Sequence, residues 1–278
     1  MTHRYAPCIT LLVLLAAVTC APAAVFHTTL DNGLTVIIEE NHAKPIVSVQ
    51  VFVRTGSMHE QEYLGSGISH FFEHIISGGT TRTRTEDESR IMLETIGKNT
   101  NAYTTVDHTA YFIHTTTDHW TTALDLLADW MLNSLITEEE FQREKGVVQR
   151  EIEQGLDNPR RQLFQLLGET RYKVHPSRYP VIGYKELVQQ ITRDDLLTYY
   201  QRMYTTNNMV LVVVGDVDAT AALDNIRHTF GQGERRRLPA LSLPQEPLQV
   251  GKRSAVKEMD ITQAHMAISF NTVPLTHA

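Results

Sequence analysis

Alternating apolar and polar positions predict several strands along the chain. Residues 46–53 place valine at every second position, so one face of this segment is entirely apolar, which is typical of a half-buried strand. Residues 35–38 are also typical of a strand, and the Asn32-Gly33 pair before them favours a tight turn, so we predict that a hairpin opens the domain. Residues 110–116 predict another strand, and the continuous apolar run 209–214 predicts a buried central strand.

Other segments repeat their apolar positions every three or four residues and predict helices. Residues 64–77 have this spacing, and two glycines follow as a stop signal. Residues 138–156 are amphipathic, and Thr137 with Glu140 three positions later is a capping-box sequence that predicts the start of a helix. The remaining predicted helices lie at residues 88–96, 120–135, 163–170, 192–203 and 219–230.

The first 24 residues are typical of a signal peptide. Arg4 is followed by a short apolar core at residues 9–18 and by small residues at 21–24, which suit cleavage. We therefore expect a mature chain that begins near Val25 and is exported across the cytoplasmic membrane to the periplasm. Lipid attachment at Cys20 is the alternative, although the residues before it are a poor match to a lipoprotein site.

Composition also changes near the other end of the chain. We place one main domain at residues 25–231 and a linker rich in proline and arginine at residues 232–250. Residues 251–278 contain the alternating Met266, Ile268 and Phe270 of a strand, but this segment is too short to bury a core of its own. We expect it to be the beginning of a truncated second domain.

Charge and composition exclude some classes of protein. A hydrophobic content of 42% can fill a core, and a net charge of −7 gives no electrostatic reason to expect a nucleic-acid partner. No segment of the mature chain approaches the roughly 20 apolar residues of a transmembrane helix. Both cysteines lie in the predicted signal peptide, so we expect no disulfide in the mature protein.

The helix predicted at residues 64–77 carries an HxxEH motif. His70 and His74 are four positions apart, so both imidazoles project from one face and can bind the same metal ion, with Glu73 on the same side. A third ligand is required, and Glu144 and Glu151 share a face of a later helix, so both can point into this site. Taken alone, the histidines suit ordinary core packing and the two acids suit a solvated helix face.

With these motifs the chain resembles the N-terminal domain of the insulinase/pitrilysin family of zinc metallopeptidases, which includes the mitochondrial processing peptidases. That family pairs HxxEH with a distal carboxylate at the spacing seen here. Further matches are Leu30-Asp31-Asn32-Gly33-Leu34, Asn101-Ala102-Tyr103-Thr104 and Val213-Val214-Gly215-Asp216. The resemblance covers roughly residues 25–231.

The resemblance implies a role for each motif residue. It implies that His70, His74 and Glu151 bind one Zn²⁺ per chain, that Glu73 is the general base that activates water, and that Glu144 is a supporting acid. The expected fold is α+β, with a mainly antiparallel sheet packed against helices and with the zinc helix facing the Glu151 helix beside one sheet edge.

The resemblance also implies how a substrate binds. Asn101, Ala102 and Tyr103 would belong to an edge strand to which an extended peptide adds through main-chain hydrogen bonds. The alternative for Asn101-Ala102 is a simple turn. Family members usually bring a second homologous domain, so we expect this chain to need such a domain or a partner chain.

Three functions remain open at this point. The first is a zinc-dependent metalloendopeptidase or oligopeptidase that hydrolyses extended peptides or unfolded polypeptides. The second is a noncatalytic or partner-dependent peptide-binding subunit of a peptidase complex, although such subunits typically lose a motif residue and this chain has all of them. The third, a small-molecule enzyme like the one that cleaves S-ribosylhomocysteine, is disfavoured because its chemistry uses a cysteine that the mature chain lacks.

Overall fold

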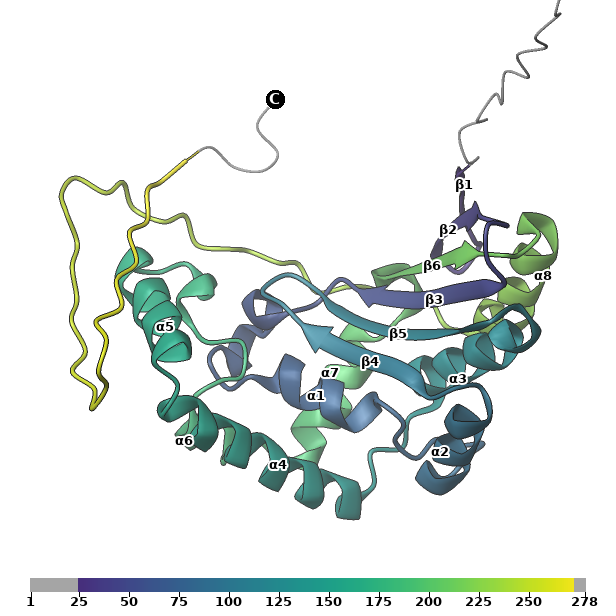
Figure 1. Ribbon diagram of the computed structural model, residues 1–278, viewed down its shortest axis with the longest axis horizontal. Coiled ribbons are helices and arrows are strands. Elements are labelled where there is room, and N and C mark those ends of the chain that lie inside the picture. The colour runs from purple at the N-terminus through teal and green to yellow at the C-terminus, as the bar shows by residue number, and fades with distance from the viewer. Residues whose placement is uncertain (1–24, 273–278) are drawn as a thin grey trace, which may run out of the picture.

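The computed structural model describes residues 25–272, and its main feature is a six-stranded sheet packed against helices (Figure 1). The strands are β1 (Val25–Thr29), β2 (Thr35–Glu40), β3 (Ile46–Val53), β4 (Asn99–Thr104), β5 (Thr109–Thr116) and β6 (Met209–Gly215). The helices are α1 (Ile68–Ile76), α2 (Glu86–Thr95), α3 (Trp120–Asn133), α4 (Glu138–Leu156), α5 (Pro159–Arg171), α6 (Lys185–Val188), α7 (Arg193–Met203) and α8 (Ala219–Thr229). The predicted α+β class is confirmed.

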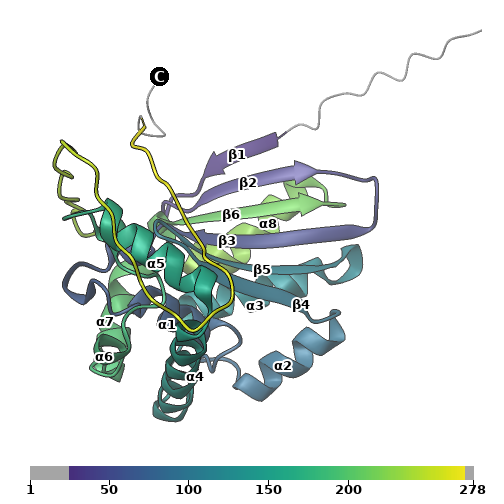
Figure 2. The ribbon, with the colours of Figure 1, turned by 60° about the vertical axis from the view of Figure 1, so that its left-hand side comes forward.

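The strands follow one another in the order β1-β2-β6-β3-β5-β4, as Figure 2 shows from top to bottom. All neighbouring pairs are antiparallel except β2 and β6, which run parallel, so the prediction of a mainly antiparallel sheet is also confirmed. The apolar strand β6 lies inside the sheet between β2 and β3, as its continuous apolar sequence predicts. Among the described residues, β4 is the last strand of the sheet, so one side of its backbone has no strand neighbour there.

The core lies between one face of the sheet and the helices. In β3 the valines at 47, 49, 51 and 53 are at most 2% exposed, while the alternate side chains are partly exposed. Helices α1, α3 and α8 contact the sheet, and α4 packs against α1. Burying each of these valines contributes roughly 1.5–3 kcal/mol, which fixes the register of β3 against a one-residue slip.

Local sequence explains where helices α4 and α1 begin. Thr137 and Glu140 form the predicted capping box, in which each side chain accepts a hydrogen bond from the other residue's backbone N–H. Helix α1 begins at Ile68, later than predicted. Gly65 and Gly67 have φ of +82° and +66°, and these left-handed conformations keep the chain out of a helix until that point.

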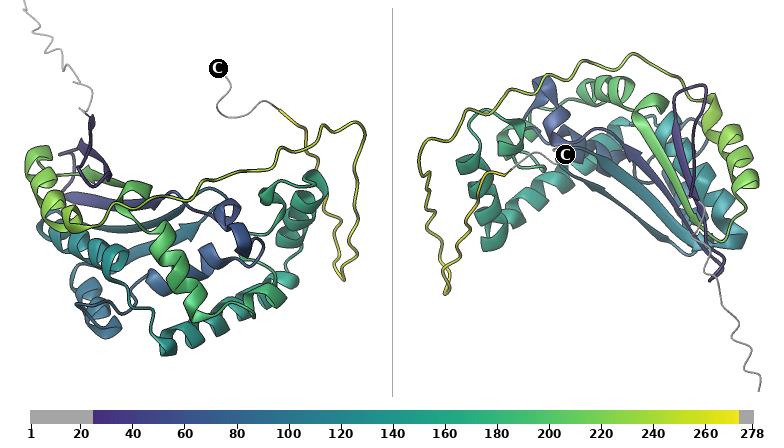
Figure 3. Two further views of the ribbon diagram at one scale, coloured as in Figure 1. Left: turned by 180° about the vertical axis from the view of Figure 1, so that it is seen from behind. Right: turned by 90° about the horizontal axis from the view of Figure 1, so that it is seen from above.

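The segment after α8 differs from the prediction. Residues 233–272 form no helix or strand, and they run from the α8 end of the molecule to α5 (Figure 3). The strand predicted around Met266, Ile268 and Phe270 is therefore wrong for this structure. These side chains are 69–82% exposed, and an alternating segment needs a neighbouring strand to satisfy its backbone. The linker and second-domain boundaries stay a prediction.

Two expectations concern membranes. Within residues 25–272, none of the helices combines the length and the apolar composition that crossing a bilayer demands. The predicted signal peptide and the alternative at Cys20 lie outside the described residues.

Candidate metal centre

Helix α1 presents its two histidines on one face and buries the other face. Phe71 and Phe72 are fully buried in the core, which fixes the rotation of the helix. His70 and His74 then stand one turn apart on the opposite, partly exposed side, with ring centroids separated by 4.8 Å. The two imidazoles lie together as predicted. Burial of Phe71 and Phe72 holds the helix in the orientation that places both histidines on its other face.

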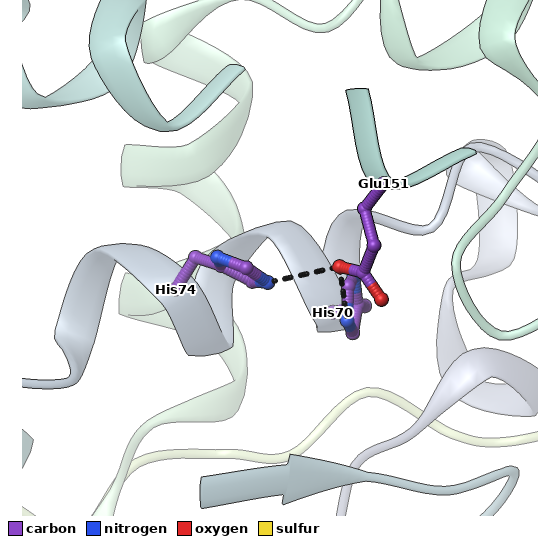
Figure 4. A group of neighbouring side chains, drawn as sticks. All are labelled: His70, His74 and Glu151. Carbon is purple, nitrogen blue, oxygen red and sulfur yellow. Dashed lines mark ion pairs between the residues drawn. The ribbon is translucent and has the colours of Figure 1, made fainter. Parts of the chain in front are cut away.

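Helix α4 brings Glu151 to both histidines. Its Oε2 lies 3.7 Å from Nε2 of His70 and 3.6 Å from Nε2 of His74, and Figure 4 shows one carboxylate oxygen facing both rings. The three donor atoms all lie within 4.8 Å of one another. Two atoms bonded to one tetrahedral zinc ion at about 2.0–2.2 Å are separated by about 3.4 Å, so this donor set fits such an ion with small side-chain adjustments.

The two histidines differ in their electrostatic surroundings. Burial lowers the pKa of His70 to about 4. Burial also acts to lower the pKa of His74, but contacts with Glu144 and Glu151 outweigh it and raise this pKa to about 9. The contact with His74 lowers the pKa of Glu151 to about 2. Without a metal ion near neutral pH, His74 is therefore protonated, while His70 is neutral and Glu151 is ionised.

Glu144 occupies a different position from Glu151. Its Oε2 lies 3.5 Å from Nδ1 of His74, on the opposite side of the ring from Glu151, and its Oε1 accepts a hydrogen bond from Arg143 at 3.0 Å. The contact with His74 lowers the pKa of Glu144, so its carboxylate stays ionised. A carboxylate at this nitrogen fixes the tautomer that leaves Nε2 free for a metal ion.

Glu73 lies on α1, between the two histidines in sequence, and is nearly buried, with 9% of its surface exposed. Burial raises the pKa of its carboxyl group. Its Oε2 accepts a hydrogen bond of 2.6 Å from Oγ1 of Thr104 on the edge strand β4. A carboxylate of raised basicity beside a metal site can take a proton from a water molecule.

The three candidate substrate-binding residues lie on β4. Pairing of Asn101, Ala102 and Tyr103 with β5 shows that this segment is a strand, so the alternative of a simple turn is wrong. Ala102 packs against the core, whereas Asn101 and Tyr103 are exposed. Helix α1, which carries His70 and His74, contacts β4, the last strand of the sheet.

Comparison with known proteins decides the family. The model of the insulinase family (peptidase family M16) matches residues 35–185, which is more than half of the chain and includes every candidate site residue. The chain belongs to this family. The model named "Peptidase M16 inactive domain" matches residues 190–278.

Individual relatives named as proteases or peptidases agree with this assignment. "Uncharacterized zinc protease YmxG" of Bacillus subtilis is 31% identical over 249 residues, covering 90% of this chain and 59% of that protein. The β subunit of the mitochondrial processing peptidase of Caenorhabditis elegans is 34% identical over 205 residues, covering 74% and 44%. The chain thus spans about half the length of the curated relatives it matches.

Solved structures of proteases share the fold. A protease from Helicobacter pylori is similar with a TM-score of 0.77 and 28% identity, covering 83% of this chain and 56% of that one. The first half of the periplasmic protease PqqL from Escherichia coli is similar with a TM-score of 0.71 and 25% identity, covering 78% and 48%.

Sequence analysis missed two side chains at the site. Thr104 contacts Glu73, and strand alternation from Ala102 would have placed Thr104 on the same face, toward α1. Arg161 contacts Glu151, but no spacing in the sequence indicates this because the two residues lie on different helices joined by a tight corner.

Proposed function

We propose that this chain is the zinc-binding part of a metallopeptidase that hydrolyses peptide bonds in extended peptides or unfolded polypeptides. The observation that carries this proposal is the convergence of two imidazoles and one carboxylate on a single point, beside a nearly buried carboxylate and the free edge of a sheet. Membership of the M16 family and the zinc protease names of its relatives support the choice of metal and of reaction.

His70, His74 and Glu151 would hold the ion. Two neutral imidazoles and one carboxylate leave a bound zinc ion with a net positive charge, and such an ion polarises a carbonyl group and lowers the pKa of a water molecule to about 7. Glu73 takes a proton from the attacking water and delivers it to the leaving amine. Its Oε2 is held by Thr104, so Oε1 is the oxygen available for this transfer.

Glu144 acts on His74 in this scheme. Its Oε2 lies 3.5 Å from Nδ1 of the imidazole, and this contact favours the proton on Nδ1 and so presents Nε2 to the ion. Because it lies beyond the ring, it is a positioning residue and not a ligand.

The free edge of β4 is the proposed substrate-binding element. An extended peptide added beside Asn101, Ala102 and Tyr103 would run past Glu73, because Thr104 of the same strand contacts that carboxylate. Main-chain hydrogen bonds recognise any extended segment, so this mode suits peptides and unfolded chains better than folded proteins.

We expect catalysis to require a second homologous domain or a partner chain. The sequence spans about half the length of its curated relatives, one of which is a subunit of the mitochondrial processing peptidase. The periplasm is the proposed location, supported by the leader-like first 24 residues and by the similarity to a periplasmic protease.

The proposal is tested by hydrolysis of a quenched-fluorescence peptide of unstructured sequence, with and without a chelator. The wild type is compared with Glu73→Gln, which removes the base but no ligand, and with Glu94→Gln, a control at an exposed glutamate on α2. We expect chelator-sensitive cleavage by the wild type and the control, and loss of cleavage with retained zinc in Glu73→Gln.

If the chain binds zinc without cleaving, the same assay is repeated with the full-length protein or with a homologous partner chain added. Cleavage that appears only then supports the partner requirement. Cleavage that persists in Glu73→Gln, or that survives zinc removal, contradicts the proposed mechanism.

A further inference from the structure

Arg161 of α5 contacts the ligand residue Glu151 at two points. Its Nη2 donates a hydrogen bond of 3.2 Å to Oε1 of the carboxylate, and its Nη1 donates one of 3.1 Å to the backbone carbonyl of the same residue. One guanidinium therefore fixes both the main chain and the side chain of Glu151. This two-point contact restrains the side-chain torsions of Glu151 more than a single ion pair would.

The corner between α4 and α5 is built so that Arg161 can reach back. Asn158 caps α5 by accepting from the Arg161 N–H at 3.0 Å, and the buried Gln162 donates to the carbonyl of Gly155 at 2.9 Å. Gly155 has no side chain and so leaves room for the Arg161 side chain. A Cβ at position 155 would lie 2.7 Å from Cδ and 2.8 Å from Nη1 of Arg161. Any larger residue at 155 would push the arginine away from Glu151.

The two oxygens of Glu151 thus have separate partners. Oε1 is held by Arg161, and Oε2 faces Nε2 of both His70 and His74. We propose that Arg161 is a positioning residue, which holds Oε1 of Glu151 so that this carboxylate binds the metal ion through Oε2 alone. Gly155 provides the space that Arg161 needs for this contact. This inference rests on the proposed zinc site, and it explains how a fourth position stays open for water, since a carboxylate that bound through both oxygens would fill it.

Because Arg161 is positively charged, its direct electrostatic effect on zinc affinity and its effect through the orientation of Glu151 have opposite signs. Removing a positive charge near a cation site by itself strengthens cation binding. A weaker affinity in Arg161→Gln would run against this direct charge effect and would therefore indicate lost orientation of the carboxylate. Arg160 is the matched control, because it is the adjacent exposed arginine and lies over the Phe164 ring, away from Glu151.

The zinc affinity of the wild type, Arg161→Gln and Arg160→Gln is measured by competition with a chromophoric chelator, with the thermal unfolding of the metal-free proteins recorded alongside. We expect zinc affinity to fall about 10-fold or more in Arg161→Gln, the usual effect of losing a residue that orients a ligand, and to stay within about 2-fold of wild type in Arg160→Gln. Equal affinities in the two variants, or tighter binding in Arg161→Gln, overturn the inference.

A second pair of variants keeps the charge and displaces the side chain. Gly155→Ala forces Arg161 to shift, whereas Gly146→Ala on the same helix meets only the Nη1 of Arg150 at 3.4 Å. Both changes raise the helix propensity of α4, so neither is expected to unfold it. We expect weaker zinc binding in Gly155→Ala alone, and wild-type affinity in Gly155→Ala contradicts the inference even if Arg161→Gln is unstable.

These results separate the two claims. A wild type that binds no zinc refutes the proposed function together with this inference. A wild type that binds zinc, with all four variants alike, refutes the role of Arg161 and leaves the proposed function standing.

Discussion

The hydroxyl group of Thr104 donates a hydrogen bond of 2.6 Å to Oε2 of Glu73, and this contact joins the edge strand β4 to the proposed general base on α1. The strand that would align a peptide is therefore the strand that orients the base. A hydrogen bond to a charged group contributes about 1.5–3 kcal/mol, so its loss is large enough to measure in a rate.

We predict that Thr104→Val lowers kcat by about 10-fold or more, because valine has the same shape but no donor, and 1.36 kcal/mol corresponds to a factor of ten in rate. Thr104→Ser keeps the donor and should stay near wild type. Steady-state peptide hydrolysis checks this, using the chain alone or with its second domain or partner, whichever form cleaves. Zinc content and peptide affinity are measured alongside and should not change. Similar kcat values for the valine and serine variants would refute the link.

Glu144 and Glu151 should differ in their effect on zinc. Glu151→Ala removes a proposed ligand and should abolish stoichiometric binding, whereas Glu144→Ala removes only the acceptor at Nδ1 of His74 and should weaken binding about 10–100-fold. Chelator competition measures both, with Glu139→Ala as the control at an exposed glutamate of α4. If Glu144→Ala binds zinc as tightly as the control variant, the contact at Nδ1 of His74 does not contribute to zinc affinity.

Zinc binding should release about one proton at pH 5.5. With a pKa of about 4 His70 is already neutral, with a pKa of about 9 His74 is protonated, and with a pKa of about 2 Glu151 is ionised. Titration calorimetry in buffers of different ionisation enthalpy counts these protons. Two histidines with ordinary pKa values near 6.5 would release about two, and that result would contradict the asymmetry of the site.

The same pKa values predict how the metal-free fold responds to pH. The pKa of His74 is raised on folding, so its contribution is fully present below pH 6.5 and is lost as the pH rises toward 9. The pKa of Glu151 is lowered, so its contribution is present above pH 4.5 and is lost as the pH falls toward 2. Thermal unfolding of wild type and His74→Gln should show a larger loss of stability between pH 6.5 and pH 9 in the wild type, and an equal loss in both would contradict the raised pKa of His74.

A buried carboxyl group near the start of α1 provides a separate pH test. Glu60 is 1% exposed and accepts a hydrogen bond from the Ser69 N–H at 3.0 Å, and burial raises its pKa to about 8. The folded state therefore holds this proton more tightly than the unfolded state, and stability falls as the pH rises from 4.5 to 8. Glu60→Gln removes this loss while keeping an acceptor for Ser69.

We expect the difference in Tm between Glu60→Gln and wild type to shift in favour of the variant by more than about 3 °C between pH 5 and pH 8, roughly the effect of 1 kcal/mol in a domain of this size. Scanning calorimetry of metal-free protein at the two pH values gives this difference. A constant difference would mean that Glu60 titrates in the fold as it does in the unfolded chain.

The elements of this site with a regular sequence pattern were predictable. The spacing of His70 and His74 fixes them to one helical face, and the seven-residue interval between Glu144 and Glu151 puts both acids on one side of α4. Which acid meets both histidines depends on how α4 packs against α1. Spacing left that choice open, and only the family resemblance favoured Glu151.

Other features depend on tertiary contacts that leave no local pattern. Strand β4 has the polar sequence NTNAYT, and its edge position was inferred from resemblance and not from alternation. The contact between Arg161 and Glu151 arises from the α4–α5 corner. The predicted strand near Met266 has the right alternation, but within residues 25–272 no strand lies beside it, so no ladder forms there.

The central claim is tested most directly by the zinc content per chain of the purified protein, for wild type, Glu151→Gln and Glu153→Gln. Glu153 is the matched control because it lies two positions away on α4, is exposed and pairs with Lys185. The account predicts one zinc per chain in wild type and in Glu153→Gln, and substantially less than one in Glu151→Gln. Zinc-free wild type, or equal zinc in the two variants, would contradict it.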